Sequence, residues 1–254
     1  MTEGSSHHIP PIGIVAATAD GAALCYRTLC LEAERLMGPH AHPEITMHQL
    51  PLRHYLACID AGDWAGVAAL MTRSAALLAQ VGAELIICPN NTLHRAFDLI
   101  VSPLPWLHIA EPVGAEAFRR NFRKVGLLGT QVVMEGTAYQ PVFERHGIEI
   151  VLPQPHECID LDRIIRTELI GGEYLPESRR SVQGIISTMA ANGVEAVILG
   201  CTELPLLLSE RESPLPFLDS TRLLARAAVH FMVQARQHKQ LHTHVIPLHP
   251  SFSQ

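Results

Sequence analysis

The chain lacks an excess of positive charge. Lysine and arginine total 19 against 25 aspartates and glutamates, so the formal net charge is −6 with histidine neutral. A broad basic surface for nucleic acid is therefore absent. No apolar run approaches the ~18 residues of a membrane span, and we expect no membrane partner. The opening MTEGSSHHIPP has no cationic segment followed by an apolar one, so we expect no signal peptide and a cytoplasmic protein.

Paired cysteines are also missing. The six cysteines form no CxxC pair, which argues against a disulfide framework or a structural zinc site, and most are expected to be buried apolar side chains. The 15 histidines are dispersed. Two short clusters, HAH (40–42) and HTH (242–244), have no carboxylate or cysteine nearby to complete a ligand set. We therefore expect no metal site.

Short apolar runs alternate with amphipathic stretches along the 254 residues, of which 48% are hydrophobic. Helices are expected at 21–38 and 63–82, the second with Asp63 as its N-cap. Because the apolar runs are continuous Val, Ile and Leu, they indicate parallel strands that helices cover on both faces. The expected strands are 12–17, 44–50, 84–89, 106–110, 124–130, 148–153, 195–200 and 215–219.

The sequence contains an internal repeat. GAELIICPNNTLH (82–94) overlays GVEAVILGCTELP (193–205) with an offset of 193 − 82 = 111, and IGIVAATADGAALCY (12–26) overlays VGLLGTQVVMEGTAY (125–139) with an offset of 125 − 12 = 113. One reading is that any two strand–turn–helix segments look alike. The near-equal offsets favour the other reading, a duplicated α/β unit.

We therefore predict an α/β fold of two pseudo-symmetric Rossmann-like units, each with a parallel sheet. The first unit is expected to comprise 1–110 and 215–238, the second 111–214, and a tail 239–254. The strand C-termini of both units would meet at a cleft, where ligands bind in open α/β sheets. In the overlay Asn90 falls opposite Cys201, so the cleft would hold one amide and one thiol at equivalent places.

Five segments of the chain form an ordered set: NNTLH, GLLGT with ME following, RIIRTELIGGE, GCTELPLLL and LPFLDST. Together they resemble the Asp/Glu racemase superfamily, and more specifically its aspartate racemase branch. The likeness extends over roughly residues 10–235. It implies a cofactor-independent amino-acid racemase that forms a homodimer and acts on a small amino acid or dicarboxylate, with an acidic amino acid favoured.

The family places two cysteines on opposite sides of the substrate α-carbon. One removes the α-proton as a thiolate, and the other returns a proton from the far face. Cys201 matches the second cysteine, and its place between a strand and a helix start is expected to favour a thiolate. The first cysteine is Asn90 here, and Cys88 lies two residues too early on the strand. The glycine-rich loop after the family's first strand is also replaced, by AATADG.

Further residues match binding positions. Arg53, in LPLRHY, stands where the family puts a carboxylate-binding arginine, although an arginine after a loop is often only a surface charge. A second group consists of short polar residues that follow strands and would bind a carboxylate, cap a helix, or do both. These residues are Asn91, Thr92, Thr130 and Thr202. His94 is expected to be structural. Glu203 would orient a neighbouring group or serve only as a first-turn helix acid.

Three functions remain open from the sequence. The first is a racemase-like enzyme with Cys201 as its retained thiol and Asn90 in place of the other. The second is a one-thiol lyase, decarboxylase or isomerase that acts on a small carboxylic acid from one face. The third is a non-catalytic protein that keeps the cleft for a small acid. Solvent deuterium helps to distinguish them, because exchange of an α-proton without racemisation would favour a one-base enzyme, whereas ligand binding without exchange would favour the third.

Overall fold

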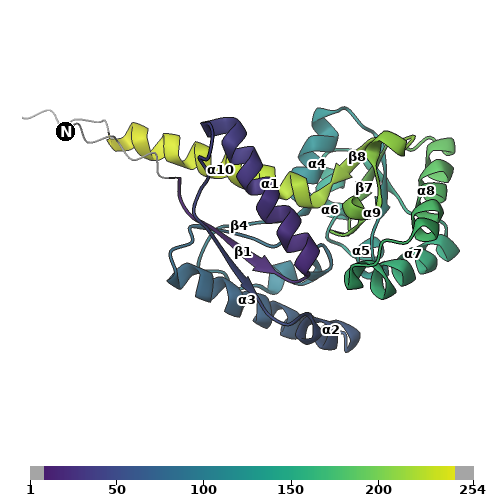
Figure 1. Cartoon of the computed structure of the whole chain (residues 1–254), viewed down its shortest axis with the longest axis horizontal. Coiled ribbons are helices and arrows are strands. Elements are labelled where there is room, and N and C mark those ends of the chain that lie inside the picture. Colours follow the sequence, from purple (N-terminus) through teal and green to yellow (C-terminus); the bar gives the residue numbers. More distant parts are fainter. Residues whose placement is uncertain (1–8, 244–254) are drawn as a thin grey trace, which may run out of the picture.

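The computed structural model describes residues 9–243, with side chains described up to residue 235. Within these residues the strands form two parallel four-stranded sheets, one in each of two lobes (Figure 1). The strand order is β2-β1-β3-β4 in the first sheet and β6-β5-β7-β8 in the second. The two orders are the same when β5 to β8 replace β1 to β4, which confirms the predicted α/β fold of two similar units.

The first lobe follows the predicted order closely, and each of its strands begins within two residues of an expected one. Asp63 caps its long helix as predicted, because the side chain accepts a hydrogen bond from the Gly66 amide at 2.8 Å. The elements are β1 (Ile12–Ala16), α1 (Ala19–Met37), β2 (Ile45–Gln49), α2 (Leu52–Asp60), α3 (Trp64–Gln80), β3 (Leu85–Ile87), the 3₁₀ helix η1 (Thr92–Leu99) and β4 (Trp106–Leu107).

The second lobe repeats this arrangement with shorter helices after some strands. Its elements are α4 (Ala110–Arg119), β5 (Lys124–Leu128), α5 (Gln131–Met134), α6 (Gln140–Arg145), β6 (Glu149–Val151), α7 (Pro155–Thr167), η2 (Leu169–Gly171), α8 (Pro176–Ala191), β7 (Ala196–Leu199), α9 (Leu204–Leu207), η3 (Glu210–Glu212) and β8 (Phe217–Asp219). The chain then returns to the first lobe as α10 (Ser220–Thr243), which packs along α1 (Figure 1).

The return of the chain differs from the expected boundary at one strand. We expected residues 215–219 in the first unit, but β8 pairs with β7 in the second sheet, with Leu199 opposite Asp219. An apolar run in the sequence does not indicate which sheet the strand will join, because that depends on its pairing with a strand distant in the sequence. Helix α10 continues to Thr243, past residue 239 where a tail was expected to start; residues 244–254, including part of HTH, lie outside the described residues.

The internal repeat has a structural counterpart at the turns before β3 and β7. Gly82 and Gly193, which coincide in the overlay, both have positive φ, +94° and +78°. This backbone conformation is strained for residues with a Cβ, so glycine is needed to end each helix and lead into the strand. The two turns therefore have the same backbone requirement, as expected of duplicated units.

Both faces of each sheet are buried, as the continuous apolar runs predicted. In β1, Ile12 and Ile14 pack against the helices α1 and α10, whereas Val15 packs on the opposite face against α3. In β7, Val197 and Ile198 divide between two clusters in the same way. Each sheet is thus a rigid support for the residues at its carboxyl edge. None of the described helices is both long and apolar enough to cross a membrane.

Candidate active site

A small cavity lies between the two lobes, at the carboxyl ends of strands from both sheets. Its volume is about 50 Å³. The polar lining residues come mostly from segments directly after strands, and they are Thr18, Asn90, Thr92, Thr130 and Arg166. The apolar lining residues come from α2, η1, α5 and η2, and they are Leu52, Leu56, Ile59, Leu93, Val132 and Ile170. This is where parallel α/β sheets bind ligands.

Asn90 lines this cavity with its amide only partly used. Its Oδ1 accepts a hydrogen bond from the Leu93 amide at 3.1 Å, which caps the start of η1. Its Nδ2 has no hydrogen-bond acceptor among the described residues, so it is available to donate to a ligand in the cavity. The side chain is therefore fixed by its oxygen and presents its nitrogen. Asn has no group that ionises, so it can hold a substrate or a water but cannot act as a base.

Two threonines join the lobes at the cavity. The hydroxyls of Thr92, after β3, and Thr130, after β5, lie 3.1 Å apart. Thr130 also caps α5 through a longer contact of 3.4 Å with the Val133 amide. A hydroxyl can both donate and accept a hydrogen bond. A carboxylate in the cavity would therefore accept hydrogen bonds from the two hydroxyls, which now contact each other. Thr130 therefore caps a helix, one of the two roles expected from the sequence, and also lines the cavity.

Cys201 follows β7 and is 7% exposed. Its Sγ donates a hydrogen bond to Oε2 of Glu203 at 3.1 Å. Burial, and then the charge of Glu203, raise the pKa of Cys201 well above its usual value, although the backbone amides of Glu203 and Leu204 oppose this. The net effect on the Cys201 pKa therefore favours the thiol form in the resting state. The local amides do act as expected, but burial and a neighbouring carboxylate outweigh them.

Cys201 does not itself line the cavity, but the next residue, Thr202, contacts a residue that does. The hydroxyl of Thr202 is 3.4 Å from that of Thr18, which lines the cavity. Gly21, in the first turn of α1, permits this approach, because a Cβ there would lie 2.5 Å from Oγ1 of Thr202. Helix α1 of the first lobe therefore packs closely against the loop of the second lobe that carries Cys201.

Two of the expected binding residues are buried away from the cavity. Asn91 donates from Nδ2 to Ser220 at 3.0 Å and accepts at Oδ1 from the Tyr139 hydroxyl at 2.6 Å. The Thr202 hydroxyl donates to Oε2 of Glu203 at 2.8 Å. Both side chains are 2–3% exposed and contribute to a polar network between the lobes. Their polar atoms already have partners, so the structure gives them a supporting place beside the site.

The cation at the cavity is Arg166 rather than Arg53. Arg53 is exposed at the start of α2, and it is not among the residues that line the cavity. Arg166, on α7, lines the cavity and pairs with Asp60 at the end of α2, with 2.9 Å between Nη2 and Oδ1. Arg166 lies within RIIRTELIGGE, a segment that carries the family resemblance, but no role was predicted for it. Its link to the first lobe is the ion pair with Asp60 on α2.

Cys88 and His94 flank Asn90 and are both buried. Cys88 is fully enclosed on the first sheet, and burial raises its pKa to about 12, so it is a poor proton carrier. Burial lowers the pKa of His94 to about 3, which leaves the imidazole neutral at ordinary pH. Its Nδ1 contacts the backbone oxygen of Asn90 at 2.9 Å. His94 therefore holds the Asn90 turn in place, in agreement with the expected structural role.

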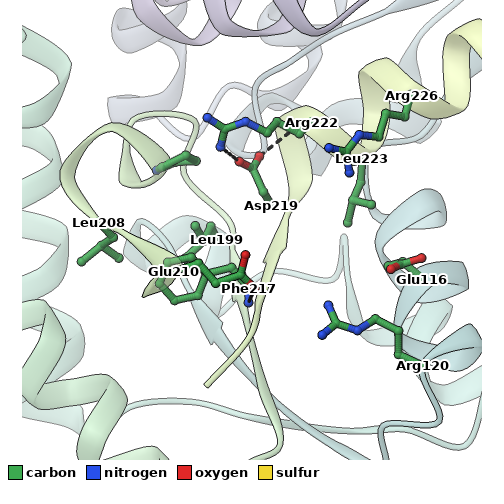
Figure 2. A pocket seen from close by; sticks show the side chains of 11 residues that line it. Glu116, Arg120, Leu199, Leu208, Glu210, Phe217, Asp219, Arg222, Leu223 and Arg226 are labelled. Atoms are coloured by element: carbon green, nitrogen blue, oxygen red, sulfur yellow. Dashed lines mark hydrogen bonds and ion pairs between the residues drawn. The ribbon is translucent and has the colours of Figure 1, made fainter. Parts of the chain in front are cut away.

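A larger cavity of about 380 Å³ lies behind the Cys201 loop, between α4, α9 and α10 (Figure 2). Leu199 and Pro205 from either side of that loop line it, but no site residue expected from the sequence does. Its arginines face carboxylates: Arg222 pairs with Asp219, as the dashed lines show. The smaller cavity is the better candidate because residues from the carboxyl edges of both sheets converge there. No cluster of metal-ligating side chains occurs among the described residues.

The sequence of the chain also matches a known protein family. The profile of a family described as Asp/Glu/Hydantoin racemase matches residues 12–228, which is most of the chain. The chain belongs to the Asp/Glu/Hydantoin racemase family. The recognition made from the five sequence segments is thus confirmed at the level of the superfamily.

Solved structures and a curated relative agree with this assignment. A candidate Asp/Glu racemase from Yersinia pestis is 30% identical and has a TM-score of 0.80, with 89% of this chain and 100% of that chain covered. An aspartate racemase homologue from Pyrococcus horikoshii OT3 is 29% identical with a TM-score of 0.73 and the same coverage. The broad specificity amino-acid racemase RacX of Bacillus subtilis is 28% identical over 157 residues, which are 60% of this chain and 66% of that protein. This chain therefore spans slightly less than two thirds of that relative.

Proposed function

We propose that this protein is an amino-acid racemase-like isomerase that moves a proton at the α-carbon without pyridoxal phosphate. The observation that carries the proposal is the equivalent placement of Asn90 and Cys201. Each follows the third strand of its sheet; Asn90 lines the interlobe cavity, and Cys201 precedes Thr202, whose hydroxyl contacts Thr18 of that cavity. The cavity that Asn90 lines is separated from Cys201 by the contact between Thr18 and Thr202.

The chemistry needs one base and a stabilised carbanion. In the proposed step the Cys201 thiolate takes the α-proton: the C–H bond breaks, an S–H bond forms, and the electron pair delocalises into the substrate carboxylate. Hydrogen-bond donors around that carboxylate lower the barrier. Asn90 Nδ2 and the hydroxyls of Thr92 and Thr130 are the available donors. Cys201 reaches the substrate when the Thr18–Thr202 contact shifts.

Inversion also needs a proton from the opposite face. Asn90 has no acidic hydrogen of useful strength, so a water held by its Nδ2 is the proposed donor there. Such a donor is far weaker than a thiol. The enzyme is therefore expected to exchange the α-proton faster than it inverts the centre. We propose a small acidic amino acid as substrate, because Arg166 offers one charge partner and the hydroxyls and amide offer a second carboxylate position.

We also propose a homodimer in solution. The support for this proposal is the family likeness. Light scattering coupled to gel filtration measures the mass directly. A mass near 27.9 kDa, that of one chain, would contradict the dimer.

The proposed activity is tested by α-proton exchange in deuterium oxide, followed by NMR on a panel of amino acids and dicarboxylates. The wild type is expected to exchange at least one acidic amino acid. Cys201→Ser should lower the rate by about 10²-fold or more, the usual contribution of a positioned acid or base. Cys88→Ser is the matched control, since Cys88 also follows a strand and is buried, but it packs in the core of the first lobe against α2 and α3.

The alternatives give different results in the same experiment. A lyase or decarboxylase would consume the substrate, so a new product would replace the exchanged amino acid. A binding protein would shift the ligand signals without exchange. Exchange that survives Cys201→Ser unchanged would remove the thiol from the mechanism.

A further inference from the structure

Helix α2 turns an apolar stripe toward the interlobe cavity. Leu52, Leu56 and Ile59 lie four and three residues apart, so they share one face of the helix, and all three line the cavity. Leu52 and Ile59 also pack against the core of the first lobe. Leu56 is partly exposed and belongs to none of the four clusters of packed apolar side chains in the described part of the chain. Core packing therefore does not explain why this position carries a leucine.

The second lobe adds apolar side chains of its own to the same cavity. Val132 on α5 and Ile170 on η2 both line it. Val132, like Leu56, is partly exposed and lies outside the packed clusters of the described residues. A single exposed apolar side chain is ordinary in a folded protein. Two such side chains that line one cavity from different lobes form a surface that an apolar group would cover favourably.

Charge is scarce around this surface. Arg166 is the only ionisable residue among the described residues that line the cavity. Its guanidinium already pairs with Asp60, with 2.9 Å between Nη2 and Oδ1. A second carboxylate of an acidic substrate must displace Asp60 from Arg166 or be repelled by it. An aliphatic side chain requires no such exchange and leaves the ion pair intact.

We infer that this cavity also takes amino acids with a short aliphatic side chain, and that the enzyme exchanges their α-proton as well. The inference rests on the proposed function. The α-carboxylate is held by the same donors, Asn90 Nδ2 and the hydroxyls of Thr92 and Thr130. The aliphatic side chain lies against Leu56 and Val132. The cavity thus divides into a polar side for the carboxylate and an apolar side for the side chain.

The bond changes are the same as those proposed for an acidic substrate. The C–H bond at the α-carbon breaks, an S–H bond forms on Cys201, and the electron pair delocalises into the α-carboxylate. The substrate side chain takes no part in these steps. Its chemistry therefore acts on binding, and KM is the parameter that reports it.

The volume of the cavity limits the length of this side chain. The cavity measures about 50 Å³. Pockets for drug-sized ligands have roughly 300–1,000 Å³, so an unbranched chain of about two or three carbons suits this one better than an aromatic ring. Each methylene group that leaves water for an apolar wall improves affinity about fourfold. Affinity is thus expected to rise from alanine through α-aminobutyrate to norvaline.

The first test measures α-proton exchange in deuterium oxide for these three amino acids, with aspartate as the acidic reference. KM is expected to fall about fourfold with each added methylene. Serine is the polar match of α-aminobutyrate, because a hydroxyl takes the place of a methyl group of similar size, and its KM should be the higher of the two. Exchange of aspartate without exchange of norvaline would overturn the inference and leave the proposed function standing.

Substitutions test the apolar wall itself. Leu56→Asn places a polar side chain of similar size at a position outside the packed clusters, and it should raise the ratio of KM for norvaline to KM for aspartate about tenfold. Arg166→Gln should move this ratio in the opposite direction, because it weakens binding of the acidic substrate. Leu31→Asn is the matched control, since Leu31 is exposed on α1 and does not line the cavity, and the ratio should stay as in the wild type.

Val132→Thr tests the wall from the second lobe and carries the test if Leu56→Asn fails to fold. It replaces a methyl group with a hydroxyl and almost keeps the shape of the side chain. The hydroxyl must give up water when an aliphatic group covers it, so the ratio should rise here too. A ratio that stays at the wild-type value in the folded variants would overturn the inference.

Binding without turnover separates this inference from the proposed function. In Cys201→Ser, calorimetric titration gives the Kd of alanine, α-aminobutyrate and norvaline. The Kd is expected to fall along the series, as KM does in the wild type. A wild type that exchanges none of the amino acids would contradict the proposed function, and the Kd series then still decides about the wall. Equal Kd values for the three amino acids would overturn the inference.

Discussion

The hydroxyls of Thr92 and Thr130 lie 3.1 Å apart, although they follow strands of different sheets. This contact marks the line where the two lobes meet at the cavity. A substrate carboxylate that enters here would replace one hydroxyl–hydroxyl contact with two hydroxyl–carboxylate contacts. In the proposed binding mode the lobes would thus hold both donors together before the ligand arrives, which would reduce the ordering that binding must impose.

Asn90→Cys is expected to create or raise racemisation in both directions. It places a second thiol at the equivalent strand end, where the proton must be returned to invert the centre. The measurement is circular dichroism of the substrate over time, starting from each enantiomer. A wild type that already interconverts both enantiomers at comparable rates would show that another group serves as the second proton carrier.

Arg166→Gln is expected to raise KM for an acidic substrate by about tenfold or more, the usual effect of losing a charged hydrogen bond. The kcat should change less, because the guanidinium binds and does not react. Asp60→Asn is the matched control. It removes the ion-pair partner but leaves the cation, and since both side chains are largely exposed it should cost about 0–1 kcal/mol in stability. Equal effects of the two substitutions on KM would mean that Arg166 acts only through the ion pair.

Gly21→Ala should impair the site, whereas Gly184→Ala should not. The new Cβ at position 21 would lie 2.5 Å from Thr202 Oγ1 and 2.7 Å from Thr18 Oγ1, so the Cys201 loop or α1 must move. We expect a loss of about 1–3 kcal/mol in unfolding free energy and a lower exchange rate. At Gly184, within α8, nothing lies within 4 Å, and alanine should stabilise the helix by roughly 0.5–1 kcal/mol. Chemical denaturation measures both; equal behaviour of the two variants would contradict the close approach at Gly21.

Stability is expected to fall with acid through His94. Its pKa is about 3 when folded, because burial disfavours the charged imidazole. The unfolded chain has an ordinary pKa near 6.5, so it binds more protons than the folded state between these values. The contribution is thus fully present above about pH 6.5 and decreases by up to about 1.4 kcal/mol per pH unit as pH falls toward 3. In His94→Gln, denaturation across this window should show a shallower pH slope. An identical slope would assign the acid sensitivity to other groups.

The strands and the duplication could be read from the sequence because they depend on local patterns. Continuous Val, Ile and Leu runs require burial on both faces wherever they lie, and Gly82 and Gly193 end helices whatever surrounds them. The Asp63 cap likewise involves an amide three residues away. The same locality identified Asn90, Thr92 and Thr130, since residues directly after parallel strands reach the carboxyl edge of the sheet.

Only the tertiary structure decided which polar groups meet. Asn91 pairs with Ser220, 129 residues away, and so turns from the cavity toward the lobe interface. Arg166 reaches the cavity through Asp60, 106 residues away, whereas Arg53 remains exposed. The sequence by itself determined two α/β units and the strand ends at which a thiol and an amide stand. The folded chain decided the burial of the thiol and which residues surround it, because desolvation and long-range contacts are set by packing and leave no local pattern.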